Sequence, residues 1–372
     1  MDKLKLMTIV GTRPEIIRLS ETIKACDVYF NHILVHTGQN WDDSLNDVFF
    51  REFGLRKPDY NIGAVGKHLG ETIGNIISGS YELLSKEKPD GLLILGDTNS
   101  SLCSISAKRL KIPIFHMEAG NRCFDQNVPE EINRKIVDHI SDINMPYTEH
   151  SRRYLLSEGI RKEHIFVTGS PMPEVLFNNM EKIEKSRVLE ELGLEEKKYM
   201  LLSAHREENI DDDDTFSSLM EAMNFIADTY KVPVIYSTHP RSWKKIDKMG
   251  FKFHKLVRKL KPFGFFDYNK LQMNSHCVLS DSGTLSEESA ILGFCGVLIR
   301  TSTEHPEVLD KGTIVMGGTN SKDIKQAIDL AVSIKEENRS LPLDYADRNV
   351  SAKVVKIIQS YAKIVDMVIW DK

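Results

Sequence analysis

The stretch Cys277-Val278-Leu279-Ser280-Asp281-Ser282-Gly283-Thr284-Leu285-Ser286-Glu287-Glu288 runs from an apolar strand through a turn of small residues into a helix. Its apolar part does not alternate with polar residues, which is typical of a strand covered on both faces of a parallel sheet. The Ser-Gly-Thr turn presents backbone N–H groups and hydroxyls, a combination that binds diphosphates. Glu288, one turn into the helix, is placed to accept hydrogen bonds from ribose hydroxyls. The stretch therefore predicts an α/β unit with a nucleotide site, and the alternative is an ordinary capped helix.

Similar strand–helix units recur on both sides of this stretch. Apolar runs predict strands at Leu6–Val10, Ile33–Thr37, Gly91–Leu95, Ile112–Met117, Ile165–Thr168, Tyr199–Ala204, Val232–Thr238, Cys277–Ser280 and Gly296–Arg300. Helical periodicity between them predicts helices that include Leu69–Lys86, Pro129–Ser141, Thr215–Tyr230 and Ser321–Lys335. Alternation on this scale predicts an α/β fold of two Rossmann-like, doubly wound domains.

The length of 372 residues also favours two domains. We expect residues 1–169 to form the N-terminal domain and residues 174–350 the C-terminal, nucleotide-binding one, with the boundary in Gly169-Ser170-Pro171-Met172-Pro173. A charged helix around Met180–Leu192 is expected at the start of the second domain. The closing segment, residues 351–372, contains a predicted helix over Ser351–Met367, which the family resemblance described below assigns to the first domain.

Composition excludes several classes of protein. Apolar residues make up 41% and charged residues 28% of the chain, and the formal charge of −5 argues against a nucleic-acid partner. No stretch approaches 18 apolar residues, so no membrane partner is expected. The five cysteines are scattered, which indicates reduced thiols in a cytoplasmic protein. The acidic run Asp211–Asp214 reads as the start of a helix, and we expect no metal.

Polar residues follow several predicted strands of the first half, where ligands bind in open α/β sheets. Arg13 lies in Gly11-Thr12-Arg13-Pro14-Glu15, where the dinucleotide fingerprint G-x-G-x-x-G is absent, so no nicotinamide cofactor is expected. Asp97 and Glu118 follow the next two strands, and Glu130 and Arg134 are one turn apart on a helix. Taken singly, Arg13 is better explained as a solvated side chain beside a capped helix, and Glu130 with Arg134 as a surface ion pair.

Two histidines follow successive strands of the second half. His205 lies in Ala204-His205-Arg206-Glu207-Glu208-Asn209, and His239 lies in Ser237-Thr238-His239-Pro240. A single histidine is more often structural than catalytic. Because two histidines occur at successive strand ends, a role in a functional site and a structural role are about equally supported.

In this order the motifs resemble those of the non-hydrolysing UDP-N-acetylglucosamine 2-epimerase family, over nearly the whole chain. The matching motifs are Gly11–Glu15, Gly96-Asp97-Thr98, Glu118-Ala119-Gly120, Pro129–Arg134, His205-Arg206-Glu207, Ser280–Gly283 and Glu287-Glu288. The resemblance implies the glycosyltransferase-B architecture, with the active site in a cleft between the two domains. It also implies an isomerase that works without a cofactor on a UDP-sugar, as a homodimer.

Two features resemble one subgroup of that family. These are the stretch Glu118–Gln126 and Arg18, where better-known members carry lysine. The subgroup comprises capsule and O-antigen enzymes that form UDP-N-acetyl-L-fucosamine by inverting C2 of the L-talo precursor. One position departs from the family, because His305 stands where arginine is usual.

The chemistry explains why such residues are needed. The hydrogen on C2 is not next to a carbonyl, so an enzyme must either oxidise C3 or expel UDP from C1. Expulsion leaves a glycal with a C1=C2 double bond, and it needs acid–base groups on both faces of C2 and cationic support for the diphosphate. The resemblance supplies these residues: Asp97, Glu118 and Glu130 for proton transfer, His205 and Arg13 for the leaving diphosphate, Arg18 and Arg134 for orientation, Ser282 and Gly283 for phosphate, Glu288 for ribose and His239 for substrate.

Two other functions fit the same turn and Glu288. One is a glycosyltransferase of the same architecture, which has no need of three strand-end carboxylates in the first domain. The other is a nucleotide-sugar sensor without catalysis, which would tolerate the loss of Asp97 and Glu130. The presence of these carboxylates favours the epimerase.

Overall fold

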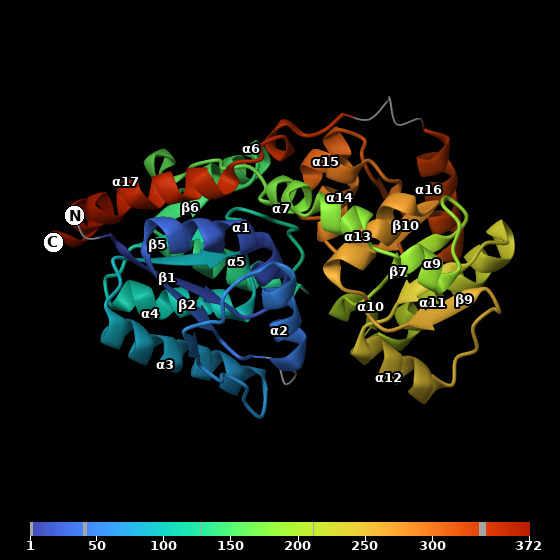
Figure 1. Cartoon of the computed structure of the whole chain (residues 1–372), viewed down its shortest axis with the longest axis horizontal. Helices are drawn as coiled ribbons and strands as arrows, with labels where there is room; N and C mark the ends of the chain where they lie inside the picture. The colour runs from blue at the N-terminus through green and yellow to red at the C-terminus, as the bar shows by residue number, and fades with distance from the viewer. Residues whose placement is uncertain (1–2, 40–42, 127, 211, 335–339) are drawn as a thin grey trace. The chain divides into compact units, whose positions relative to one another are not determined.

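The computed structural model describes residues 3–39, 43–126, 128–210, 212–334 and 340–372. The chain divides into two compact units (Figure 1). Unit 1 comprises Met1–Val175 and Asp347–Lys372, and unit 2 comprises Leu176–Ala346.

Unit 1 is built on a parallel sheet. Among its described residues the sheet has six strands in the order β3-β2-β1-β4-β5-β6. The strands are β1 (Lys5–Val10), β2 (Asn31–His36), β3 (Tyr60–Asn61), β4 (Gly91–Leu95), β5 (Ile114–Met117) and β6 (Ile143–Met145). The order places β1 beside β4, so the chain winds outward in both directions from this pair.

Helices cover both faces of this sheet. They are α1 (Arg13–Tyr29), α2 (Asp43–Glu52), α3 (Leu69–Glu87), η1 (Asn99–Cys103), α4 (Ser104–Arg109), α5 (Pro129–Ile140), α6 (Glu149–Ser157), η2 (Lys162–His164), the boundary helix α7 (Met172–Asn178) and α17 (Val350–Trp370). In Figure 1, α1 and α17 lie on one side of the sheet and α3 and α4 on the other. Met7 and Ile9 of β1 are buried in a cluster with Ile76 and Leu84 of α3, as the two-residue period of a strand requires.

The closing helix α17 belongs to unit 1. It packs along α1, and the carboxylate of Glu174 accepts hydrogen bonds from the backbone N–H (2.8 Å) and the hydroxyl (2.5 Å) of Ser351. Lys353 donates to the carbonyl of Thr168 at 2.9 Å. The bond from the N–H of Ser351 satisfies one of the N–H groups that a helix start leaves open.

Unit 2 repeats the architecture. Its described strands form a six-stranded sheet in the order β12-β11-β10-β7-β8-β9, and every pairing is parallel. The strands are β7 (Met200–Ser203), β8 (Val234–Ser237), β9 (Val257–Leu260), β10 (Cys277–Ser280), β11 (Gly296–Leu298) and β12 (Val315–Met316). The helices are α8 (Met180–Glu184), α9 (Val188–Leu192), α10 (Glu207–Ile210), α11 (Asp213–Tyr230), α12 (Pro240–Met249), α13 (Phe265–Asn274), α14 (Thr284–Leu292), α15 (Pro306–Asp310), α16 (Ser321–Ser333) and η4 (Leu343–Tyr345).

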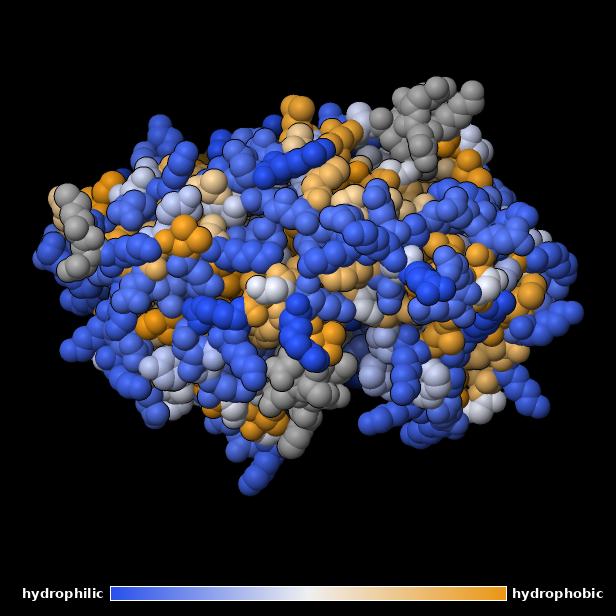
Figure 2. Space-filling view, in the orientation of Figure 1, coloured by the Kyte–Doolittle hydropathy of each residue, from blue (hydrophilic) through white to orange (hydrophobic). Residues whose placement is uncertain are grey.

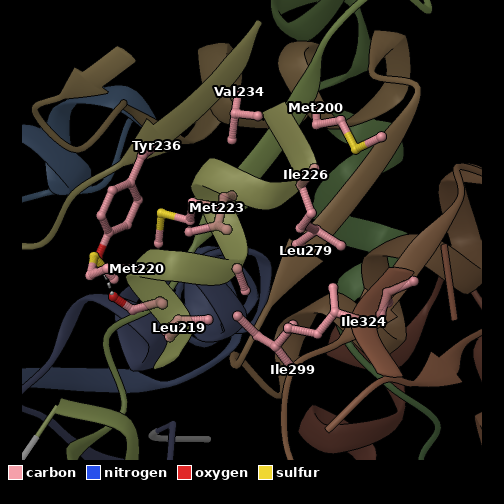
Figure 3. Packing of buried hydrophobic residues seen from close by; sticks show 14 of the residues in the cluster. Met200, Leu219, Met220, Met223, Ile226, Val234, Tyr236, Leu279, Ile299 and Ile324 are labelled. Atoms are coloured by element: carbon pink, nitrogen blue, oxygen red, sulfur yellow. Dashed lines mark hydrogen bonds between the residues drawn. The ribbon is translucent and has the colours of Figure 1, made fainter. Parts of the chain in front are cut away.

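The core of unit 2 shows why these elements form. Met223 and Ile226 of α11 and Ile324 of α16 pack on Met200 and Leu279 from the central strands (Figure 3). All five are at most 1% exposed. Burial of side chains of this size stabilises the unit by about 1.5–3 kcal/mol each.

Two predicted elements are wrong. Ile165–Thr168 is not a strand, because it makes only one isolated bridge, between Asn144 and Ile165. The predicted helix Met180–Leu192 is two short helices, α8 and α9. Ser186 interrupts it, since its hydroxyl accepts from the N–H of Val188 (3.3 Å) and donates to Asp267 (2.5 Å). Local side-chain bonds of this kind compete with helical ones.

The surface and the cysteines are those of an ordinary globular chain. The face drawn in Figure 2 is mostly hydrophilic, with apolar residues in small separate groups. None of the five cysteines, all of which lie within the described residues, forms a disulfide. No helix within the described residues is long and apolar enough to cross a membrane.

Candidate active-site residues in the two units

Both sheets place predicted site residues at the point where their strand order reverses, which is where α/β sheets bind ligands. In unit 1 the reversal lies between β1 and β4, whose carboxyl ends lead into Arg13 and Asp97. In unit 2 it lies between β7 and β10, whose ends lead into His205 and Ser282.

Asp97 is held by Arg134. Arg134 Nε donates to Asp97 Oδ2 at 2.7 Å, and the Asp97 side chain stays 20% exposed. Asn133 Nδ2 donates to the carbonyl of Asp97 at 2.8 Å, which also fixes the backbone of the turn. A carboxylate that is oriented by an arginine and still reaches solvent can exchange a proton with a ligand.

Glu118 is the counterpart of Asp97 at the end of β5. Its Oε2 pairs with Nη1 of Arg18, and its Oε1 accepts from Asn121 Nδ2 at 3.4 Å. Arg18 is 4% exposed and lies over the ring of Tyr147, 5.8 Å from its centroid. Glu118 has a backbone φ of +62°, a left-handed conformation that is uncommon for residues other than glycine and often marks functional sites.

The structure places Glu130 and Arg13 at helix starts. Glu130 lies in the first turn of α5 and is half-buried. Arg13 is the first residue of α1, is exposed, and lies over the ring of Phe49 at 5.4 Å from its centroid. Both positions are consistent with contact to a ligand, and neither defines one.

Three carboxylates of unit 1 that the sequence analysis did not assign turn out to hold this site together. Glu131 Oε2 accepts from Arg134 Nη1 at 2.7 Å, and its two oxygens accept from the N–H groups of Cys123 and Phe124, both at 3.2 Å. Burial favours the neutral form of Glu131, but these partners keep the pKa of its carboxyl below the usual range. No sequence signal separates Glu131 from Glu130 beside it.

Asp138 is the second of these carboxylates. It is 1% exposed, it accepts from the N–H of Gly120 at 3.1 Å, and it pairs with Arg122 at 2.7 Å and His116 Nδ1 at 3.0 Å. Against the effect of burial, His116 and Arg122 lower the pKa of Asp138. The Nε2–H of His116 donates to the carbonyl of Gly96 at 2.9 Å, so Asp138 supports the turns that carry both Asp97 and Glu118. The third carboxylate, Glu15, joins β1 to β4 and is treated below.

In unit 2, Asp281 organises the turn around His205. Asp281 is fully buried, and its oxygens accept from the N–H groups of His205 and Arg206, each at 2.9 Å, and from Asn209 Nδ2 at 3.0 Å. The His205 ring remains 38% exposed, with Nδ1 at 3.4 Å from Asp281 Oδ1. Its centroid lies 6.2 Å from that of His239. The two predicted histidines are therefore neighbours.

The turn between β10 and α14 leads into a helix start, and within it the N–H of Ser282 donates to Ser280 Oγ at 3.1 Å. Ser282 Oγ lies 3.1 Å from Thr284 Oγ1, and both residues are half-buried. Gly283 is needed for space, because a Cβ there would lie 2.9 Å from Glu304 Oε1 and 3.5 Å from His305 Nε2. Glu288 is 5% exposed, and its Oε2 accepts from Gln272 Nε2 at 2.8 Å.

His305 lies in a buried network of charges beneath this turn. Its Nδ1 lies 3.0 Å from Glu307 Oε1, and Glu304 pairs with Arg206 at 2.8 Å and with Arg300 at 2.9 Å. Burial alone lowers the pKa of the His305 imidazole, but the bond to Glu307 and the charges of Glu287 and Glu304 raise it to about 9. His305 is thus a cation at neutral pH, the charge that an arginine would supply.

No group of three or more His, Cys, Asp or Glu side chains is arranged to hold a metal ion in the part of the chain that the structure describes.

The fold and these sites define an α/β protein with two doubly wound units, carboxylate–arginine pairs in the first and a turn of small residues at a helix start in the second. The family model described as UDP-N-acetylglucosamine 2-epimerase matches residues 24–359. A UDP-N-acetylglucosamine 2-epimerase structure from Rickettsia bellii is 46% identical, covers all of both chains and has a TM-score of 0.92. The chain therefore belongs to the UDP-N-acetylglucosamine 2-epimerase family, and it is a non-hydrolysing isomerase.

Two further relatives show the range of the family. The Methanocaldococcus jannaschii UDP-GlcNAc 2-epimerase in complex with UDP-GlcNAc and UDP is 33% identical, covers 96% of this chain and 100% of its own, and has a TM-score of 0.90. The UDP-2,3-diacetamido-2,3-dideoxy-D-glucuronate 2-epimerase of Pseudomonas aeruginosa is 34% identical over 85% of this chain and 88% of its own. Of the three functions considered from sequence, the family assignment supports the isomerase.

Proposed function

We propose that this isomerase inverts C2 of UDP-2-acetamido-2,6-dideoxy-L-talose to form UDP-N-acetyl-L-fucosamine, a surface-polysaccharide precursor. The observation that carries the reaction type is the pair of arginine-held, partly exposed carboxylates, Asp97 and Glu118, which follow the neighbouring strands β4 and β5. The L-fucosamine assignment rests on Arg18 and the stretch Glu118–Gln126. The diacetamido-glucuronate relative supports it, because it shows that family members act on sugars other than N-acetylglucosamine.

The proposed reaction is an elimination of UDP followed by its re-addition. A carboxylate removes the C2 proton, the C–H electron pair forms the C1=C2 double bond, and the C1–O bond electrons leave with UDP. A second carboxylate then protonates C2 from the opposite face, and a phosphate oxygen of UDP re-forms the bond to C1. Acid–base groups on both faces are required, and Asp97, Glu118 and Glu130 are our candidates.

Cations and N–H groups are proposed to hold the departing diphosphate. Arg13 and His205 would carry the developing negative charge, and Ser282 and Gly283 would bind phosphate at the start of α14. Glu288 would bind ribose hydroxyls, His239 would contact substrate, and Arg18 and Arg134 would orient substrate and carboxylates. We also propose that the protein works as a homodimer, which light scattering would test.

Proton NMR in D2O tests this proposal. Incubation with UDP-N-acetyl-L-fucosamine, without added acceptor, should give the L-talo epimer with deuterium at C2 and traces of UDP and glycal. UDP-GlcNAc should react much more slowly. If C2 keeps its original hydrogen, the elimination route is wrong. If only UDP-GlcNAc is epimerised, the substrate assignment is wrong and the family chemistry stands.

A further inference from the structure

Glu15, in the first turn of α1, makes more contacts than a helix-start residue needs. The spacing Thr12-x-x-Glu15 is that of a capping box, whose glutamate usually reaches back to the helix start at the surface. Glu15 is instead 1% exposed. Its Oε2 accepts from the N–H of Gly11 at 3.1 Å and from the hydroxyl of Thr12 at 2.8 Å.

The same carboxyl also contacts the turn after β4. Thr98 Oγ1 lies 3.1 Å from Glu15 Oε2, and Ser100 Oγ lies 2.5 Å from Glu15 Oε1. The two hydroxyls lie 2.5 Å from each other. Three oxygen–oxygen contacts therefore close a ring through Glu15, Ser100 and Thr98.

The ring needs one more proton than its hydroxyls carry. Each hydrogen bond requires a donated hydrogen, and the hydroxyls of Thr98 and Ser100 supply one each. The hydroxyl of Thr12 and the N–H of Gly11 are already directed to Oε2. The third contact of the ring is satisfied if Oε1 of Glu15 carries a proton and donates it to Ser100, which donates to Thr98, which donates back to Oε2.

We propose that Glu15 is a protonated carboxylic acid in the active protein and acts as a positioning residue, which joins the turn that carries Arg13 to the turn that carries Asp97. The inference rests on the proposed function, since Asp97 is its proton-transfer candidate. Loss of the Glu15 proton leaves one contact of the ring without a hydrogen. Thr98 and Ser100 then separate from each other or from the carboxylate, and Asp97, bonded to Thr98 through the backbone, moves with them.

The surroundings of Glu15 agree with a neutral acid. Burial, opposed by the hydrogen bonds from Ser100, Thr12, Thr98 and Gly11, raises the pKa of Glu15 to about 7. The ionisable groups on the surrounding elements include Arg13 and Arg18 on α1, His36 at the end of β2, Asp97 after β4 and Cys103 on η1. The charge of an ionised Glu15 would also raise the pKa of the buried Cys103 thiol.

The variant Glu15→Gln tests the proposal, because its amide has a permanent donor in place of the acid proton. For the wild type we expect kcat/KM to fall about thirtyfold between about pH 6 and about pH 8.5, as Glu15 with a pKa of about 7 ionises. Glu15→Gln should hold kcat/KM within about twofold over that range. Glu21→Gln is the matched control, since Glu21 lies on the same helix and pairs with Lys24 at 2.8 Å. It should follow the wild-type profile.

A second measurement does not depend on catalysis. In protein labelled with ¹³C at glutamate carboxyl groups, NMR should show one carboxyl that titrates near neutral pH and is absent from Glu15→Gln. If Glu15→Gln does not fold, Ser100→Ala identifies the same signal by shifting it. A Glu15 signal that is already ionised at about pH 5 would overturn the proposal, as would identical pH profiles for Glu15→Gln and the wild type. A neutral-pH titration together with full activity of Asp97→Asn would refute the role of Asp97 and leave the Glu15 proton in place.

Discussion

Asp97, Glu118 and Glu130 differ from the structural carboxylates around them because each remains partly exposed. Glu131 and Asp138 are almost fully buried, whereas Asp97 and Glu118 are oriented by an arginine and remain partly exposed. We expect Asp97→Asn, Glu118→Gln and Glu130→Gln each to lower turnover about a hundredfold or more, because the shape is kept and the proton-carrying function is lost. The proton NMR assay measures this.

A suitable control for these variants is Glu149→Gln, which removes an exposed carboxylate that pairs with Arg152 in the same unit. Its turnover should be that of the wild type. Urea unfolding should show little change for all four proteins. Near wild-type turnover in all three test variants would mean that these carboxylates have no part in the reaction.

His305 makes the stability of unit 2 depend on pH. Its pKa is raised from 6.5 to about 9, so the folded state holds its proton more tightly than the unfolded state does. The stabilisation, about 3 kcal/mol, is complete below about pH 6.5 and is lost as the pH rises through about 9. Urea unfolding at both ends of this window should show the fall. His305→Arg keeps the cation and should flatten the dependence, and an unchanged slope in that variant would assign it to another group.

At the scale of the element, the turn between β10 and α14 depends on the missing side chain of Gly283. A methyl group there would meet Glu304 Oε1 at 2.9 Å, and Glu304 is held by two arginines and cannot move easily. Gly283→Ala should therefore weaken UDP binding by about tenfold in calorimetry, about 1.4 kcal/mol. Gly74→Ala is the control, because Gly74 lies exposed on α3 with open space around it. Equal UDP affinity in both variants would contradict a phosphate site at this turn.

Elements were predictable from the sequence where a run of apolar residues was long enough. Gly91–Leu95 and Cys277–Ser280 are strands with the predicted bounds, because four or five buried residues in a row leave few alternatives. The two-residue strands β3 and β12 carry no such signal. Ile165–Thr168 is apolar enough, but pairing depends on a neighbouring strand, which sequence pattern alone does not specify.

The residues of the candidate site were likewise only partly predictable from the sequence. Residues that follow a strand, such as Asp97 and His205, could be located because strand ends meet at one edge of a sheet. Their partners could not. Successive residues of a helix point about 100° apart, so only the folded chain shows that Arg134 contacts Glu131 and Asp97.

At the scale of the whole molecule, the two units have the same strand order. They carry different parts of the proposed function. The proton-transfer candidates Asp97, Glu118 and Glu130 belong to unit 1, and the phosphate and ribose candidates Ser282, Gly283 and Glu288 belong to unit 2. Each sheet has its own core, so a substitution in one unit should leave the fold of the other intact. Binding and chemistry should therefore be separable by mutation.

Glu288→Ala and Asp97→Asn test this division together. Glu288→Ala should weaken UDP binding by about 1–3 kcal/mol, the scale for losing hydrogen bonds to a charged acceptor, and should change the rate of bound substrate less. Asp97→Asn should bind UDP as the wild type does and turn over about a hundredfold more slowly. Calorimetry with UDP and NMR rates at saturating substrate measure the two effects. Loss of UDP affinity in Asp97→Asn would mean that Asp97 itself contributes to nucleotide binding. Unchanged affinity in a folded Glu288→Ala would remove the ribose role, because Glu288 would then serve only to hold Gln272.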